Sequence, residues 1–188
     1  MDVLVLTGRG QDFANRVSLE SGQPVQQCYQ CGKCTAGCPA APFMDYPPHQ
    51  VVRLVQLGLE EEALSCGAIW LCASCYACTA RCPCRIEVAR IMDFLRARAR
   101  RRGLHRGRRA ALFADLFLDS VRRHGRVHEL EVGARWGLLT GRVFREADLA
   151  AGLAARGKLR LRPPRAGGAE EVRRIFREAA RLEEGEHG

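Results

Sequence analysis

The chain has 188 residues, a formal net charge of +9 and ten cysteines. Its 47% of hydrophobic residues excludes a wholly disordered chain, and its length suits one domain with long extensions. No apolar run approaches the roughly 18 residues that a membrane-spanning helix requires, and Val3–Leu6 is too short for the core of a signal peptide. We therefore expect a cytoplasmic protein, in which cysteines serve metal or redox chemistry more often than disulfides.

Residues 1–24 are expected to form an N-terminal segment. Within it, Val3–Leu6 predicts a short strand, and Gly8-Arg9-Gly10 follows, as in the first part of a dinucleotide-binding fingerprint. The third glycine of that fingerprint would fall at position 13, where Phe13 stands. Nucleotide binding is therefore not predicted here.

Residues 25–104 form a cysteine-rich centre that is predicted to be helical between its cysteines. Pro47-Pro48 marks the start of a helix, whose apolar residues recur at helical spacing: Val51, Val52, Val55 and Leu59. Gly58 is expected to break it, and Glu60-Glu61-Glu62 suits the first turn of a second short helix. A further amphipathic helix covers Ile86 to Leu95 and ends in arginines before Gly103.

Residues 105–188 contain no cysteine and are predicted to be a helical C-terminal extension. Ala110 to Val121 and Ala169 to Leu182 both have one apolar face, which predicts two helices. Between them, glycines interrupt the pattern, and Leu159–Leu161 alternates like a short edge strand before two prolines. The whole chain is expected to be mostly α.

The cysteines form two copies of the motif C-x2-C-x2-C-x3-C-P, which begin at Cys28 and Cys72. This motif holds 4Fe–4S clusters in bacterial ferredoxins, and in two-cluster proteins its fourth cysteine ligates the other cluster. We therefore predict two clusters, whose ligands are Cys28, Cys31, Cys34 and Cys82 for the first and Cys72, Cys75, Cys78 and Cys38 for the second.

The spacing has a physical reason. Three cysteines at intervals of three on a tight loop can direct their sulfurs at three corners of a cubane, and Gly32 and Gly37 are expected to let the backbone approach closely. A pair of tetrahedral zinc sites is the alternative, although structural zinc usually takes two separated pairs of ligands. Cys66 and Cys84 lie outside both motifs and are expected to be non-ligands, Cys66 as a buried residue and Cys84 beside a cluster.

Two further groups have weaker claims to a function. His124 and His128 have the spacing of a helical metal pair, but Gly125 lies between them and no carboxylate motif accompanies them. The arginines between Arg96 and Arg109 suit a solvated helix end or a docking surface for an acidic partner better than a contact with nucleic acid. Two oxidised clusters of about −2 each would also lower the net charge from +9 to about +5.

Beyond the motifs, the sequence resembles the C subunit of heterodisulfide reductase. The resemblance rests on Cys28–Pro39, Val52–Gly58 and Ile69–Cys78, and it continues through Val121–Val127, Gly157–Leu161 and Gly168–Val172, so that it covers roughly residues 10 to 180. More distantly, the centre is similar to the helical ferredoxin domain of succinate dehydrogenase iron–sulfur subunits.

The resemblance implies an α-helical ferredoxin-type domain with two 4Fe–4S clusters. It also implies a protein that relays electrons between the A subunit, a flavoprotein, and the B subunit, which reduces disulfides on clusters held by Cys-Cys-Gly motifs. The chain itself has no adjacent cysteine pair, which is consistent with a relay and not a catalytic role. The long helical insert between Cys38 and Cys72 also favours the helical fold over the compact β-rich ferredoxin.

The sequence is compatible with two other functions. One is the iron–sulfur subunit of another oxidoreductase, of the succinate or glycolate dehydrogenase kind, against which the C-terminal resemblance argues. The other is a cluster- or zinc-containing nucleic-acid-binding protein, for which the share of aromatic residues, 6%, offers little base stacking.

Overall fold

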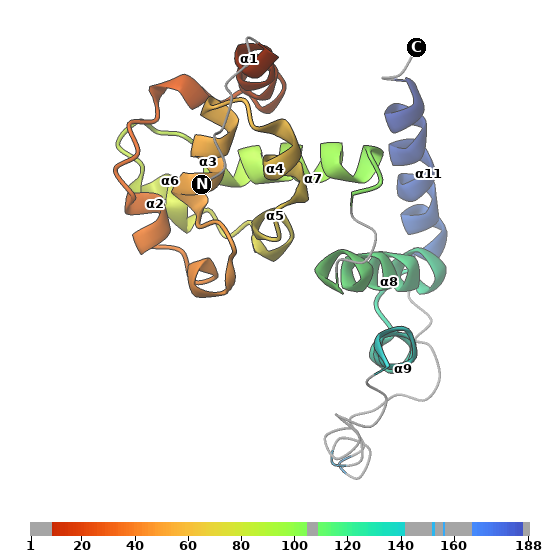
Figure 1. Ribbon diagram of the computed structural model, residues 1–188. Helices are drawn as coiled ribbons and strands as arrows, with labels where there is room; N and C mark the ends of the chain where they lie inside the picture. Colours follow the sequence, from red (N-terminus) through yellow and green to blue (C-terminus); the bar gives the residue numbers. More distant parts are fainter. Residues whose placement is uncertain (1–8, 105–108, 142–151, 153–155, 157–166, 186–188) are drawn as a thin grey trace. The chain divides into compact units, whose positions relative to one another are not determined.

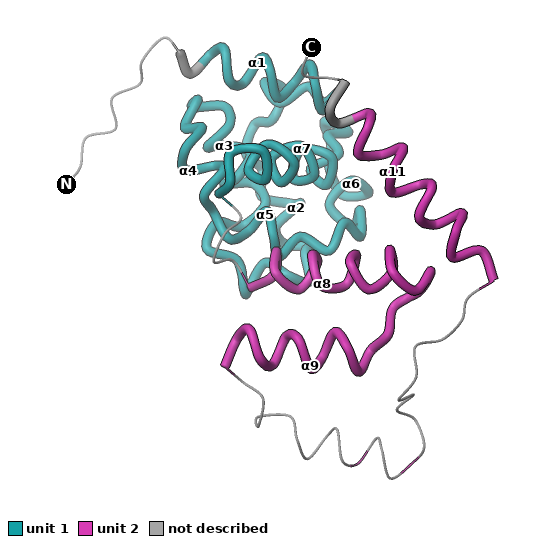
Figure 2. The backbone as a smooth tube through the Cα atoms, turned by 90° about the vertical axis from the view of Figure 1, so that its right-hand side faces the viewer, with its two compact units in different colours: residues 1–108 teal, residues 109–188 magenta. Residues whose placement is uncertain are grey.

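The structure, a computed structural model, describes residues 9–104, 109–141, 152, 156 and 167–185. The chain divides into two compact units, residues 1–108 and 109–188 (Figure 2). The described residues form helices and no strand, so the prediction of a mostly α fold is confirmed. The strands predicted at Val3–Leu6 and Leu159–Leu161 lie outside the described residues, and the finer domain boundaries at residues 24 and 104 stay predictions.

The first unit consists of seven α-helices and two 3-10 turns among its described residues (Figure 1). In chain order these are α1 (Arg9–Ser21), η1 (Val25–Gln27), α2 (Lys33–Ala36), η2 (Ala41–Phe43), α3 (Pro48–Gln56), α4 (Glu60–Ser65), α5 (Ala68–Leu71), α6 (Ala77–Arg81) and α7 (Val88–Arg101). Helix α1 packs against α3 and α7, while α2 packs against α6.

The apolar residues predicted for the centre do form its core. Val51, Val52 and Val55 of α3 are fully buried, as are Ile91 and Leu95 of α7. Each side chain of this size contributes about 1.5–3 kcal/mol when it leaves water. The helices are therefore stabilised mainly by their buried faces, because most are too short to persist alone.

Two predicted helix boundaries differ from the structure. Helix α3 begins at Pro48 as expected but ends at Gln56, so that Leu59 lies outside it, and Gly58 adopts a φ of 71°, which suits the chain reversal into α4. Helix α7 begins at Val88, so the buried Ile86 precedes it.

Four of the eight arginines from Arg96 to Arg109 lie in α7, and Arg102 directly follows this helix. Arg98 contacts Glu60 at 2.6 Å, and Arg102 contacts both Glu60 at 2.9 Å and Glu61 at 2.6 Å. These ion pairs join the end of α7 to the start of α4. The acidic first turn of α4 thus forms ion pairs with α7 and also interacts favourably with the dipole of its own helix.

The second unit contains the helices α8 (Arg109–His124), α9 (Glu129–Thr140) and α11 (Ala169–Gly185), and α8 packs against both of the others. Helices α8 and α11 were predicted. Helix α9 was not, because Gly133 and Gly137 lower its intrinsic helix propensity by about 1 kcal/mol each. Tertiary contacts supply the difference: Val132 is buried, and the ring of Trp136 meets Phe113 of α8 edge-on, with centroids 5.6 Å apart.

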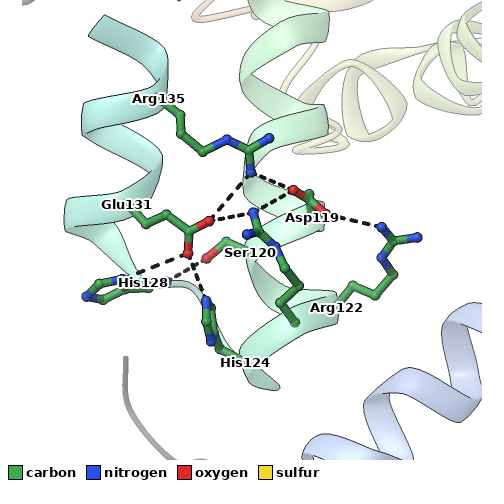
Figure 3. Close-up of polar contacts among 8 residues, drawn as sticks. Asp119, Ser120, Arg122, His124, His128, Glu131 and Arg135 are labelled. Atoms are coloured by element: carbon green, nitrogen blue, oxygen red, sulfur yellow. Dashed lines mark hydrogen bonds and ion pairs between the residues drawn. The ribbon is translucent and has the colours of Figure 1, made fainter. Parts of the chain in front are cut away.

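A polar network joins α8 to α9 (Figure 3). Asp119 of α8 accepts hydrogen bonds from Arg123 and Arg135, and Glu131 of α9 pairs with Arg123 and with His124 Nε2 at 2.8 Å. The hydrogen bond from Arg135 lowers the pKa of Asp119. Burial raises the pKa of Glu131, but His124 and Arg123 outweigh it, so that this pKa is also lowered.

The lowered carboxyl pKa values predict an acid-labile contact between α8 and α9. A group whose pKa is lower in the folded state stabilises that state above its unfolded pKa of about 4 and loses this effect as the pH falls through the folded value. We expect amide protection in α8 and α9 to decrease below about pH 4, as measured by hydrogen-exchange mass spectrometry corrected for the intrinsic pH dependence. In the double variant Asp119→Asn, Glu131→Gln, the amide protection of α8 and α9 should no longer decrease below about pH 4. The same pH profile of protection in the double variant and the natural chain would contradict the prediction.

Candidate metal centre

The two cysteine motifs fold into the same local backbone. In each, a residue between the first two cysteines and a residue between the second and third adopt positive φ: Gln30 and Gly32 in the first motif, Ser74 and Tyr76 in the second. Gly32 and Tyr76 then cap the short helices α2 and α6. Gly32 adopts its φ of 73° without steric cost, whereas a left-handed non-glycine residue such as Tyr76 costs about 1–2 kcal/mol. With this shared backbone conformation, the first three cysteines of each motif line one hollow.

The first hollow in the unit is lined by four thiols from both motifs. Cys28, Cys31 and Cys34 come from the first motif and Cys82 from the second, and the hollow encloses about 330 Å³ of empty space, part of it open to solvent. The rest of the lining is mainly apolar and includes Val52 and Ile86.

The second hollow repeats this arrangement with the motifs exchanged. Cys72, Cys75 and Cys78 come from the second motif and Cys38 from the first, around about 410 Å³ of empty space that is also partly open to solvent. Its other lining residues are mainly apolar: Pro39, Ala40, Met44, Pro48, Ala73, Tyr76, Ala77, Val88, Ala89 and Met92. The structure thus gathers the same two sets of four cysteines that the motif spacing predicts, including the exchanged fourth cysteine.

The two remaining cysteines lie outside these linings. Cys66 is 3% exposed within the core, and its thiol donates to the carbonyl of Ala63 at 3.3 Å, which confirms that it is buried. The thiol of Cys84 donates to the carbonyl of Gln27 at 3.2 Å. The ligand roles of the other eight cysteines stay a prediction.

The donor set fits a polynuclear cluster. Four thiols around a single zinc ion would lie within about 4 Å of one another, because each Zn–S bond is about 2.3 Å long. Among the described residues, no three Cys, His, Asp or Glu side chains converge closely enough to hold a single metal ion. Four cysteines line each hollow, which is the ligand type and number of a 4Fe–4S cluster.

Burial raises the pKa of two thiols of the predicted ligand sets in the absence of metal. It raises the pKa of Cys34 to about 11, although Thr35 opposes the shift through its backbone N–H. Burial also raises the pKa of Cys72. The Ser74 backbone N–H and the Arg96 guanidinium both lower this pKa, and the effect of Arg96 is larger than that of Asp93, which raises it. Since metal ligands must be thiolates, cluster binding releases protons at these sites.

Side chains from two helices clamp the cysteine loops, and sequence reasoning missed them. From α3, Gln56 Nε2 donates to the carbonyls of Val25 at 3.0 Å and Cys28 at 2.8 Å. From α7, Arg96 donates to the carbonyls of Ile69 at 2.9 Å and Cys72 at 3.0 Å. The signal was a polar residue on an otherwise apolar helix face, one turn after Val52 or Met92.

Further residues near the motifs have structural roles. His49, which the sequence did not single out, lines the first hollow, and its Nδ1 lies 2.7 Å from the Thr35 hydroxyl. A Cβ on Gly37 would meet the Arg81 side chain, so this glycine makes room for Arg81. Glu131 Oε2 lies 2.8 Å from His124 Nε2 and 3.9 Å from His128 Nδ1, so a carboxylate that the sequence did not indicate accompanies both histidines (Figure 3).

Comparison with known proteins defines the class of the first unit. Residues 24–86 match the family model described as "4Fe-4S dicluster domain". The first unit is therefore a helical, ferredoxin-type iron–sulfur domain, and the second supplies the predicted helical extension.

The similar curated proteins are subunits of heterodisulfide reductases. The chain is 31% identical over 93 residues to the C subunit of the H(2):CoB-CoM heterodisulfide,ferredoxin reductase of Methanothermobacter thermautotrophicus, a match that covers 50% of each protein. It is 35% identical over 112 residues to the iron-sulfur C 2 subunit of the CoB–CoM heterodisulfide reductase of Methanocaldococcus jannaschii, covering 55% of this chain and 59% of the relative. It is 40% identical over 92 residues to the C subunit of the ferredoxin:CoB-CoM heterodisulfide reductase of Methanosarcina acetivorans, covering 49% and 36%.

These matches confirm the resemblance to the C subunit of heterodisulfide reductase. The chain spans about half the length of the curated relatives it matches. The matched stretches described above, 92 to 112 residues long, are shorter than the range of residues 10 to 180 over which the sequence suggested a resemblance.

The exchanged fourth cysteine can be tested with a matched pair of variants. Cys82 lines the first hollow, whereas the nearby Cys84 does not. We expect Cys82→Ser to lower the iron and acid-labile sulfide content of anaerobically purified protein by about half, because one cluster loses a ligand. Cys84→Ser should keep the natural content. Equal losses in both variants, or zinc without sulfide in the natural protein, would contradict the ligand assignment.

Proposed function

We propose that the chain is the electron-transfer subunit of a cytoplasmic, heterodisulfide reductase-like complex. It binds two 4Fe–4S clusters, one in each hollow, and relays single electrons between a flavoprotein resembling the A subunit and a Cys-Cys-Gly protein resembling the B subunit. The observation that supports this proposal best is the gathering of eight cysteines into two sets of four, each completed by a thiol of the other motif.

The chain's own residues prepare the two sites for this role. Each cluster, when bound, accepts and returns one electron, and the surrounding protein sets its potential. Apolar residues line both hollows and limit the access of water, and Val88 lines both, so the two sets of ligands are close neighbours. One cysteine in each set, Cys31 and Cys75, is exposed, which brings an edge of each site to the surface where a partner can exchange electrons.

The alternatives are less well supported. Arg98 and Arg102 already pair with Glu60 and Glu61, which makes them less available to a phosphate backbone, so we expect no nucleic-acid partner. The iron–sulfur protein of a succinate or glycolate dehydrogenase would use the same clusters. The curated relatives favour the heterodisulfide reductase type. No described helix is long and apolar enough to cross a membrane.

Anaerobic co-purification tests the complex. We expect a tagged chain to retain a flavoprotein and a protein with Cys-Cys-Gly motifs, identified by mass spectrometry. Cys75→Ser should damage one cluster and stop electron relay between these partners, while the half-reaction of each partner stays measurable. A variant that keeps both clusters and full relay, or recovery of succinate dehydrogenase-type partners, would contradict the proposal.

The second unit is proposed to dock the partners. On α11, Ile175 and Leu182 are 61% and 67% exposed and lie two turns apart on one face, although the apolar residues of a helix usually face a core. On α8, Leu118 is exposed as well. Exposed apolar faces of this kind are typical of protein interfaces.

A charge on this face should disrupt docking without disturbing the clusters. We expect Ile175→Asp to lower partner recovery at least several-fold in the anaerobic co-purification, because a carboxylate would be buried in the interface. Ala180→Asp places the same charge on another side of α11, where Ala180 is exposed, and should leave recovery unchanged. If both variants retained partners equally, α11 would not be the docking face.

A further inference from the structure

The clamps on the two cysteine loops are equivalent in position. Gln56 and Arg96 each donate to the carbonyl of the first cysteine of a motif, Cys28 or Cys72, at 2.8 and 3.0 Å. Each also donates to the carbonyl three residues earlier, in Val25 or Ile69. The two helices α3 and α7 therefore hold the two loops by the same backbone atoms.

The equivalence extends to the loops themselves. Gln30 and Ser74 occupy the same place in the two motifs, and both have positive φ. The Gln30 amide donates to Gln56 Oε1 at 3.4 Å, and the Ser74 hydroxyl donates to Asp93, which in turn accepts from Arg96. Each clamp is thus one small network that joins a helix to a cysteine loop.

The clamps differ in charge. The group that touches the first loop is a neutral amide, and the group that touches the second is a guanidinium, which is always protonated. The partner carboxylate of Arg96, Asp93, contacts Ser74 and not a cysteine, and its side chain is 47% exposed against 28% for Arg96. Both groups contact the Cys72 loop, Arg96 at the Cys72 carbonyl and Asp93 at the Ser74 hydroxyl. Arg96 is the less exposed of the two, so water screens the cation less than its counterion.

Other charges and dipoles near the motifs are weaker influences. Lys33, Arg81 and Arg85 are exposed, and solvent screens them. Arg53 contacts Gln56 Oε1 and is itself exposed, so the amide separates it from the first loop. Two hydrogen bonds reach ligand sulfurs of the first site: the Gln30 amide donates to Cys28 Sγ at 3.4 Å, and the Ile86 backbone N–H donates to Cys82 Sγ at 3.3 Å. Both donors are neutral, whereas Arg96 carries a full charge, and charged donors interact about twice as strongly.

We infer that Arg96 is a positioning residue that gives the second cluster site, Cys38, Cys72, Cys75 and Cys78, a higher reduction potential than the first. Reduction adds one negative charge to a cluster, and a fixed cation beside the ligand loop favours that state. In a singly reduced chain the electron then resides at the second site. The transfer moves one electron and breaks or forms no bond. This inference rests on the proposed function, which supplies the clusters.

Redox titration of variants tests the assignment. Arg96→Gln copies the neutral clamp of the first site and should lower the more positive of the two one-electron potentials, measured by EPR after stepwise reduction with dithionite. We expect the equilibrium constant between the two clusters to change about tenfold, or about 59 mV for one electron. Arg96→Lys retains the charge and should stay near the natural potential. Arg90→Gln removes another arginine of α7, one that pairs with Glu87, and serves as the matched control.

A variant expected to shift the potential in the opposite direction distinguishes an electrostatic effect from a folding defect. Asp93→Asn removes the counterion but keeps an acceptor for Ser74, and it should raise the same potential. Iron and sulfide contents equal to those of the natural chain, together with unchanged potentials in Arg96→Gln and Asp93→Asn, would overturn the role of Arg96 and leave the proposed function intact. A shift in the less positive potential would also overturn it. A natural chain that contains zinc and no sulfide would overturn the proposed function itself.

Discussion

The exchange of the fourth cysteine is the constraint on which the first unit depends. Each hollow takes three thiols from one motif and one from the other, so Cys38 and Cys82 must each reach across to the opposite loop. This requires α2 and α6 to meet, and they pack against each other. The segment between the motifs then has to close on itself, which it does as the short helices α3, α4 and α5. In the proposed function, the free energy of cluster binding therefore contributes directly to the folding of this unit.

The cysteine chemistry and the main helices follow from the sequence because they depend on local spacing. The motif fixes which thiols gather, and the 3.6-residue period of apolar side chains predicts α3, α7, α8 and α11. The clamps of Gln56 and Arg96 could not be predicted in this way, since each bonds carbonyls more than twenty residues distant. Helix α9 was missed for a related reason: its stability comes from contacts with α8 that outweigh the propensity of its glycines.

The arginines illustrate how a compositional signal changes once contacts are known. A net charge of +9 alone suggests an anionic partner. In the structure, Arg98 and Arg102 pair with α4, Arg123 and Arg135 pair with carboxylates between α8 and α9, and Arg96 binds backbone carbonyls. Much of the positive charge thus stabilises helix contacts, and the exposed apolar residues of α11 become the better indication of a partner surface.

An internal repeat poses a physical problem for an electron relay. Two identical sites would have equal potentials, and nothing in the chain would favour one direction of transfer between them. The two motifs and their backbone curls are nearly equivalent, so any difference must come from residues outside the cysteines. The helices α3 and α7 are where the repeat diverges, since one presents an amide and the other a guanidinium to the same carbonyl positions. A difference of one charge at a shared geometry can separate the potentials while it leaves the architecture of both sites unchanged, because both side chains donate the same pair of hydrogen bonds.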